Sequence, residues 1–372
     1  MIMKFSPPPC APPLPFHRLA RVSRRYRWWR PVTGTLFIGA AWTTALGLIL
    51  LLAAVIGDIG GYPEDRDGLA DFGPVANTAV DLLLIASVIP FVLLAAGWIG
   101  RRPAGTASSV AGGLRWRWLG LCVLVALPVL ALSFGVVLLL PGQDVAPSGW
   151  ARPEAFLPAM AMLVVLVPLQ SAAEEYVFRG WLLQSVGAFF RSPWCAVAPQ
   201  AVLFAAAHGW GTLWGFAELV VFGLLAGGLT VRTGGLEAAI GLHAVNNLLA
   251  FGLSAAAVDG LSSEETAADA TLPIVVIDLA GVALYTVAVL WFARRRPPQR
   301  TAPAREAVPV PSSFGCSGSP TSAPPGHSPA SASLRQSPVP GPQATGTRPT
   351  PAPAPHAAPG APETAGRPPV QP

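Results

Sequence analysis

The chain has 372 residues, of which 52% are hydrophobic and 12% are charged, and its formal net charge is +5. Ordinary soluble proteins carry roughly 25% charged residues, so this composition excludes a soluble enzyme and a nucleic-acid-binding protein of the ordinary kind. The apolar residues form blocks of about twenty, the length that crosses the hydrocarbon core of a bilayer. The sequence therefore predicts an all-α, polytopic bundle of transmembrane helices.

A basic segment, residues 1–33, precedes the first apolar block. Its cationic residues are Lys4, Arg18, Arg21, Arg24, Arg25, Arg27 and Arg30. The segment is longer than the basic part of a signal peptide, and the apolar block after it is a full membrane span. We therefore expect an uncleaved cytoplasmic N-terminal segment.

Eight apolar blocks follow, and each is interpreted as a transmembrane helix. Their ranges are 34–57, 78–100, 118–140, 155–178, 194–210, 214–232, 236–256 and 272–293. Connections rich in arginine alternate with acidic or neutral ones, in the order that eight crossings require. The pattern predicts a multi-pass protein of the cell membrane with both termini in the cytoplasm.

The chain divides into segments along these blocks. Residues 34–140 hold three N-terminal transmembrane helices, residues 150–256 hold four more, and residues 257–296 hold an acidic loop and the last helix. The stretch 297–372 is rich in proline and alanine and lacks the apolar surface needed to offset the entropy of ordering. We expect it to be a disordered cytoplasmic tail.

Polar residues inside the apolar blocks are concentrated between residues 170 and 250. Ionisable groups are costly inside a membrane, so they mark candidate functional sites. The candidates are Glu174, Glu175 and Arg179 in the fourth block, Phe204 and His208 in the fifth, and His243 and Asn247 in the seventh. Because they belong to three separate helices, they can converge only if those helices pack together.

Helical spacing assigns different surroundings to the two glutamates. Glu175 and Arg179 are four residues apart, on one helix face and within reach of an ion pair. Glu174 is rotated about 100° from that face and has no expected partner in its own helix, which suits a general base. His243 and Asn247 also share a face. With His208, these groups could activate water and stabilise an oxyanion, provided that the helix of Glu174 continues past Gly180.

The three motifs, EExxxR, FxxxH and HxxxN, occur in this order over about residues 155–256, which resembles the CAAX-protease and bacteriocin-processing family of intramembrane endopeptidases. The matching residues are Glu174, Glu175, Arg179, Phe204, His208, His243 and Asn247. The resemblance implies an all-helical membrane hydrolase that cuts a peptide bond of a membrane-associated peptide or protein. It further implies that Glu174 and His208 activate water, while His243 and Asn247 bind the oxyanion.

Metal dependence stays open at this point. Members of the family are often described as metalloproteases, and a zinc ion held by His208 and His243 is chemically compatible with these residues. A water molecule activated by glutamate alone is equally consistent with them. The helical zinc motif HExxH is absent, because His208 is followed by Gly-Trp-Gly-Thr.

The same residues are compatible with functions other than peptide hydrolysis. A non-catalytic immunity factor, adaptor or transporter could keep the same polar cluster for binding. The four cysteines show no metal or disulfide spacing, and Cys122 and Cys195 have no adjacent base in the sequence. No histidine follows Ser254 in a membrane span. We expect the isolated acids Asp81, Glu218 and Asp278 to form interhelical hydrogen bonds or to lie at the membrane interface.

Overall fold

The computed structural model describes residues 13–65, 68–141, 146, 148–263 and 266–302. The predicted tail beyond Ala302 lies outside the described residues, as do Lys4, Cys10 and Cys316. The described part is a bundle of helices with one pair of two-residue strands, β1 (Leu14–Pro15) and β2 (Thr301–Ala302). The predicted all-α, polytopic fold is therefore confirmed.

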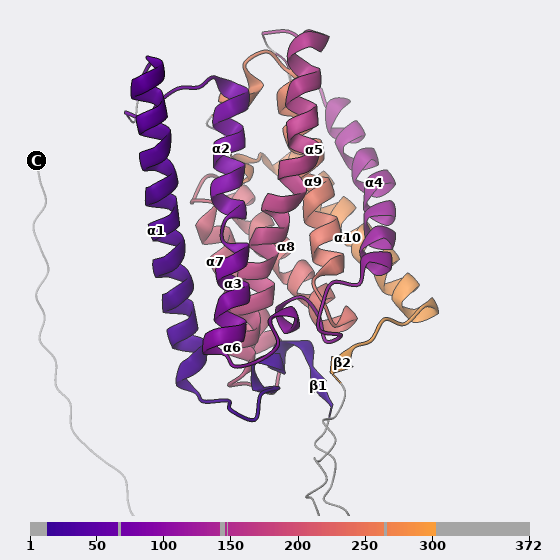
Figure 1. Cartoon of the computed structure of the whole chain (residues 1–372). Coiled ribbons are helices and arrows are strands. Elements are labelled where there is room, and N and C mark those ends of the chain that lie inside the picture. The colour runs from indigo at the N-terminus through magenta and orange to yellow at the C-terminus, as the bar shows by residue number, and fades with distance from the viewer. Residues whose placement is uncertain (1–12, 66–67, 142–145, 147, 264–265, 303–372) are drawn as a thin grey trace, which may run out of the picture. The chain divides into compact units, whose positions relative to one another are not determined.

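The helices follow the apolar blocks of the sequence. Their bounds are α1 (Trp29–Gly60), α2 (Pro74–Ala86), α3 (Ile89–Leu94), the π-helix η2 (Ala95–Ile99), α4 (Trp116–Leu138), α5 (Pro153–Glu175), the π-helix η4 (Tyr176–Leu182), α6 (Leu183–Gly187), α7 (Trp194–Ala207), α8 (Leu213–Thr233), α9 (Glu237–Ala256) and α10 (Leu272–Arg295). Short 3-10 helices are η1 (Phe16–Arg21), η3 (Ala104–Ala107), η5 (Gly260–Ser262) and η6 (Ala267–Asp269). Figure 1 shows the long helices side by side as one bundle.

Seven helices of the described chain are long and apolar enough to cross a membrane, where the sequence predicted eight. The exception is the expected span 194–210. Its helix, α7, has 14 residues and is about 21 Å long, shorter than the roughly 30 Å hydrocarbon core. α7 ends early because Gly209 and Gly211, with φ of 93° and 38°, take conformations that cannot continue a right-handed helix.

The two described ends of the bundle lie side by side (Figure 1), because β1 and β2 pair antiparallel with Leu14 opposite Ala302. We call this the strand end of the bundle. Since the described chain starts and finishes at the same end of the bundle, it runs along the bundle an even number of times. α7, which is not one of the seven long apolar helices, is the eighth run. At the opposite end, the residues before α5 meet those after α9 through a bridge between Trp150 and Ala257.

Helix α9 lies at the centre of the bundle and packs against α4, α5, α8 and α10. Its N-terminal half, from Glu237 to Val245, is buried on every side. Glu237 is held by a two-pronged ion pair with Arg115, at 2.6 Å and 2.9 Å. Tyr285 of α10 donates a hydrogen bond of 2.7 Å to the carbonyl of Ala238. These contacts fix the helix that carries His243 and Asn247.

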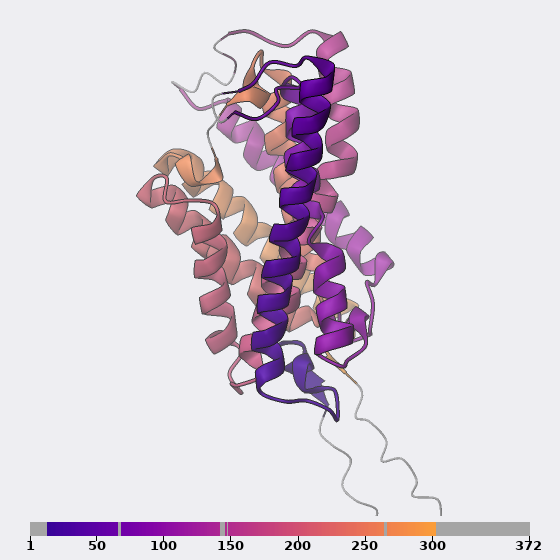
Figure 2. The same cartoon turned by 60° about the vertical axis from the view of Figure 1, so that its left-hand side comes forward.

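The described part of the basic N-terminal segment is packed against the bundle. Phe16 and Leu19 of η1 are fully buried, and Arg21 donates a hydrogen bond of 2.5 Å to the carbonyl of Ala188, just after α6. In Figure 2 the segment lies beneath the N-terminus of α1. Residues 13–33 are therefore part of the folded unit at the strand end.

Candidate active site

The two glutamates lie near the middle of one long helix. Segments α5, η4 and α6 join into a single apolar helix of 35 residues, Pro153–Gly187, so the helix continues past Gly180 as the site requires. Its geometry changes to a π-helix at Tyr176, directly after Glu175. Short π-helical insertions occur frequently at functional sites, since they change the direction of neighbouring side chains.

Glu175 is the buried anchor of the site. Its Oε1 accepts a hydrogen bond of 2.7 Å from Arg179 Nη1 and lies 2.8 Å from His243 Nδ1. The side chains of Glu175 and Arg179 are both fully buried, and the expected pairing four residues apart is present. Glu175 therefore holds the imidazole of a second helix, α9, in a fixed orientation.

The contacts of His243 define which of its nitrogens is free. A carboxylate only accepts, so Nδ1 donates to Glu175, and in the neutral ring Nε2 carries the free lone pair. That Nε2 lies 3.6 Å from Oε2 of Glu174. His243 thus connects the two neighbouring glutamates, one through each ring nitrogen.

His208 reaches the same carboxylate from the end of α7. Its Nδ1 donates a hydrogen bond of 2.9 Å to the carbonyl of Phe204, so its Nε2 is free in the neutral ring. That Nε2 lies 3.9 Å from Glu174 Oε2. Because α7 ends at Ala207, the imidazole of His208 follows the last helical residue rather than lying within a longer span.

Glu174 has a partner that the sequence interpretation missed. Its Oε1 accepts a hydrogen bond of 2.5 Å from Gln170 Nε2, one turn earlier in α5. The expectation that Glu174 has no partner in its own helix is therefore wrong. Gln170 Oε1 in turn accepts from Asn247 Nδ2 at 3.3 Å. Asn247 joins the cluster through this glutamine.

The second carboxylate oxygen of Glu174 is the atom of the cluster at which a water molecule could bind. Glu174 Oε2 is buried and has no hydrogen-bond partner among the described residues, and it faces Nε2 of both His208 and His243. Separations of 3.6 Å and 3.9 Å are too long for direct hydrogen bonds, and a bridging water is the ordinary way to satisfy such groups. The side chains of Glu174 and His208 are 13% and 23% exposed, so the position is within reach of water.

The ring of Phe204 packs against both imidazoles of the cluster. Its ring centroid lies 4.6 Å from that of His208 and 5.8 Å from that of His243, and the ring of Phe222 stacks on it at 5.7 Å. The guanidinium of Arg179 lies 4.4 Å above the same ring, within range of a cation–π interaction. Phe204 is 1% exposed, so its place in the FxxxH motif has a packing reason.

The donor atoms of the cluster are of the kind that binds zinc, but they are spaced more widely than zinc requires. Zinc takes imidazole nitrogen and carboxylate oxygen at about 2.0–2.2 Å, with tetrahedral geometry, so neighbouring donors lie about 3.3 Å apart. The Nε2 atoms of His208 and His243 are the right kind of donor, but they lie 3.9 Å and 3.6 Å from Glu174 Oε2. No group of three or more His, Cys, Asp or Glu side chains in the described chain is placed to hold a metal ion. The residues fit zinc in type but not in spacing.

The isolated acids of the sequence are not all isolated in the fold. Glu218 on α8 and Asp278 on α10 lie close enough to interact electrostatically, which agrees with an interhelical contact but corrects the view that each stands alone. Asp81, on α2, has no hydrogen-bond or ion-pair partner among the described residues. None of these three residues contacts the Glu174 cluster.

Comparison with known proteins shows what the segment that carries the site is similar to. Residues 154–249 match the sequence model of the family described as type II CAAX prenyl endopeptidase Rce1-like. Over 212 residues the chain is 27% identical to the uncharacterized protein YyaK of Bacillus subtilis (strain 168), an alignment that covers 55% of this chain and 71% of YyaK. No solved structure matches the chain significantly. The resemblance inferred from the three motifs is thereby confirmed: residues 154–249 are similar to the Rce1-like CAAX prenyl endopeptidases.

Proposed function

We propose that this multi-pass membrane protein is an endopeptidase that hydrolyses a peptide bond of a membrane-associated peptide or protein. The observation that carries the proposal is the convergence of one unpaired carboxylate oxygen, Glu174 Oε2, with the Nε2 atoms of His208 and His243. These three groups come from three helices inside the apolar bundle. The Rce1-like match over residues 154–249 supports peptide hydrolysis as the reaction.

In the proposed mechanism, Glu174 acts as the general base. A water molecule held between Glu174 Oε2 and His208 Nε2 loses a proton to the carboxylate, and its oxygen attacks the carbonyl carbon of the substrate. The carbonyl oxygen becomes an oxyanion, stabilised by an N–H of Asn247 Nδ2 and by His243 in its doubly protonated form, in which Nε2 also carries a proton. The carbon–nitrogen bond then breaks, and Glu174 returns the proton to the amine that leaves.

The surrounding residues have positioning roles in this scheme. Glu175 fixes the ring of His243, and Arg179 balances the charge of Glu175, so the pair keeps the imidazole aimed at the water position. Gln170 orients Glu174 through the oxygen that does not take part in the reaction. Phe204 packs under both imidazoles. Positioning of this kind lowers the barrier because the groups do not have to be ordered during the reaction.

The direct test is cleavage of a quenched fluorescent peptide in detergent by the purified Glu174→Gln variant. Gln keeps the shape of Glu but cannot accept the proton, so we expect the rate to fall about 10²–10⁴-fold, the usual contribution of a general base. The matched control is Glu154→Gln, in the first turn of the same helix, which should retain the wild-type rate. Full activity of Glu174→Gln, or binding of the peptide without turnover by the wild type, would overturn the proposal in favour of a non-catalytic binding protein.

We also propose that the water is activated by Glu174 without a metal ion, because the donor spacing is wider than zinc requires. A zinc ion, if bound, would be held by His208 and His243 and would polarise the water. Treatment of the purified protein with 1,10-phenanthroline is expected to leave the cleavage rate unchanged. The opposing result is loss of cleavage that added Zn²⁺ restores, together with about one zinc per chain that the His208→Gln variant lacks.

A further inference from the structure

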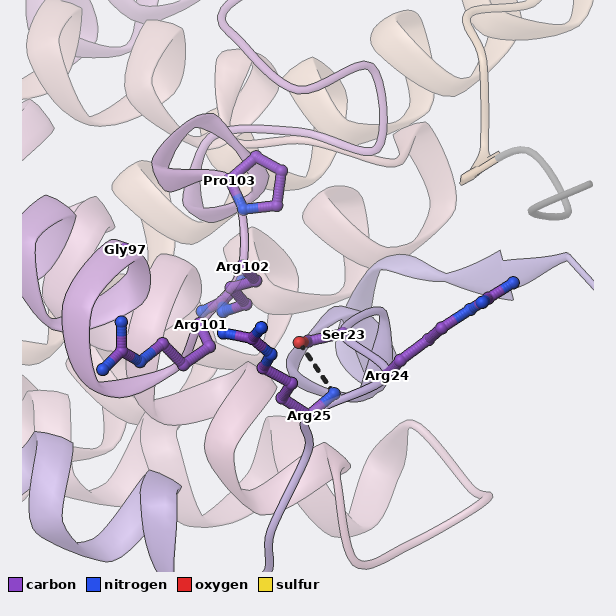
Figure 3. Close-up of a pocket in the computed structure, with 7 residues that line it drawn as sticks. All are labelled: Ser23, Arg24, Arg25, Gly97, Arg101, Arg102 and Pro103. Atoms are coloured by element: carbon purple, nitrogen blue, oxygen red, sulfur yellow. Dashed lines mark hydrogen bonds between the residues drawn. The ribbon is translucent and has the colours of Figure 1, made fainter. Parts of the chain in front are cut away.

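A pocket of about 410 Å³ lies at the strand end of the bundle, and none of the residues that line it belongs to the Glu174 cluster. Its volume falls within the roughly 300–1,000 Å³ of small-molecule sites. The residues that line it are Ser23, Arg24, Arg25, Gly97, Arg101, Arg102 and Pro103. Figure 3 shows Arg25 and Arg102 reaching toward each other, while Arg24 and Arg101 extend to either side. Four of the seven lining residues are arginine and none is acidic.

The positive charge of this pocket is not neutralised within the described chain. None of its four arginines forms an ion pair with a described acidic side chain. Arg102 is 5% exposed, and its Nη1 donates to Gln184 Oε1 at 2.5 Å and to Thr106 Oγ1 at 2.8 Å, both uncharged acceptors. Burial lowers the pKa of Arg102 to about 10. A buried cation is ordinarily paired with an anion, so this one lacks its partner.

A fifth arginine adjoins the pocket. Arg30, in the first turn of α1, lines a small neighbouring hollow together with Arg102 and Trp181. Its Nε and Nη1 atoms are buried without a hydrogen-bond partner in the described chain. Unsatisfied donors of this kind ordinarily have a ligand or a water to bind. One anionic ligand bound between them would accept hydrogen bonds from Arg30 and balance the charge of Arg102.

The surroundings place this pocket at the level of lipid headgroups. Trp28, three residues after Arg25, is 68% exposed, and Trp98, next to Gly97, is 62% exposed. Exposed tryptophan on a membrane protein is enriched at the boundary between hydrocarbon and water. The helices that border the pocket, α1 and the segment Pro74–Ile99, are both long enough to cross the membrane, and both have their pocket end at this boundary.

We propose that the arginine pocket binds the phosphate group of an anionic phospholipid. Arginine suits this ligand because its planar guanidinium donates two parallel hydrogen bonds to phosphate oxygens. We favour a lipid phosphate over a soluble one because the exposed tryptophans beside the pocket indicate that it lies at the depth of the lipid headgroups. The proposal does not depend on the peptidase assignment, because it concerns residues outside the Glu174 cluster.

The test compares lipid binding in native mass spectrometry of the purified full-length protein, with phosphatidylglycerol and phosphatidylcholine as the probes. The pocket variant combines Arg25→Gln with Arg101→Asn; asparagine tolerates the left-handed backbone of Arg101, where φ is 52°. The matched control combines Arg294→Gln with Arg296→Gln, which removes the same charge from exposed arginines at the end of α10, outside the pocket. All three proteins are compared for their preference for phosphatidylglycerol over phosphatidylcholine.

The wild type is expected to prefer phosphatidylglycerol, and the pocket variant to lose about 25-fold of that preference, the product of a roughly fivefold loss for each arginine. The control variant should change by less than about threefold, because salt screens exposed arginines that lie outside the pocket. Equal losses in the two variants would overturn the proposal, because they would show only diffuse surface attraction. Displacement of the lipid by millimolar inorganic phosphate would overturn the assignment to a lipid. If the double variant does not fold, Arg25→Gln alone decides, with an expected loss of about fivefold.

Discussion

Two adjacent carboxylates in this protein have opposite surroundings. Each has one oxygen without a hydrogen-bond partner, but Glu175 is fully buried and bonded through its other oxygen to both Arg179 and His243, whereas Glu174 is 13% exposed and bonded only to Gln170. The difference follows from the helix, which turns the two side chains about 100° apart. In the proposed function, Glu175 therefore positions the site and Glu174 exchanges the proton.

The ion pair of Glu175 and Arg179 gives a prediction at the residue scale. Arg179→Met removes the charge that balances a fully buried carboxylate, so we expect the protein to lose about 3–5 kcal/mol of stability. The double variant Glu175→Gln with Arg179→Met should recover part of that loss, because no uncompensated charge remains. Unfolding in mixed detergent and SDS micelles measures both. Equal stability of the two variants would mean that the lone charge of Glu175 is not the cause.

The sequence predicted the chemistry-bearing residues of this site better than their contacts. Glu174, His208 and His243 stood out because ionisable groups are rare in apolar blocks. Gln170 did not stand out, because glutamine is uncharged. Its spacing in the sequence does not show that its side chain links Glu174 to Asn247 rather than facing a different helix. Asn247 was expected beside the imidazole, and its bond to Gln170 depends on how α5 and α9 pack, which spacing within one helix does not define.

At the scale of the elements, apolar blocks predicted eight passes because their length is set by the bilayer. The bounds of α7 were less well predicted: hydropathy continues through the residues after Ala207, while the positive φ of Gly209 and Gly211 ends the helix. The π-helix η4 was not predicted at all. A π-helix has the composition of an α-helix, and its extra residue per turn is a property of packing rather than of residue type.

The π-helix leads to a prediction of its own. Deletion of Val177 from η4 should remove the π-helical insertion and leave ordinary α-helix, which changes the direction of the side chains around the deletion. Glu175 and Arg179 would then be three residues apart with a different bond geometry, and we expect peptide cleavage to fall while circular dichroism stays helical. Deletion of Ser148, in the connection before α5, is the control and should keep most activity. A Val177 deletion that still cleaves at the wild-type rate would show that η4 does not position the glutamates.

At the scale of the whole molecule, the arginines from which the membrane orientation was predicted lie at the strand end of the bundle. Arg115 of that end bonds both to Glu237 at the base of α9 and to the carbonyl of Gln299 beside β2. The described N-terminal segment packs there as well, through η1. The shared position of the two ends could be predicted from an even count of passes, but their pairing as β1 and β2 could not, since two-residue strands have no pattern of their own.

Arginine-rich connections face the cytoplasm in most membrane proteins, so the strand end is expected on that side. Cys195, the second residue of α7, tests this because it is exposed and follows Arg191, whose carbonyl contacts His17 of η1 at 3.1 Å. With Cys10 and Cys316 replaced by serine, a membrane-impermeant maleimide should fail to label Cys195 in intact cells and should label it in inverted vesicles. Ser148→Cys, an exposed position near the Trp150–Ala257 bridge, should show the reverse in a background that also carries Cys195→Ser. Labelling of Cys195 in intact cells would place both ends of the chain outside the cytoplasm and would turn the arginine pocket toward the outer leaflet.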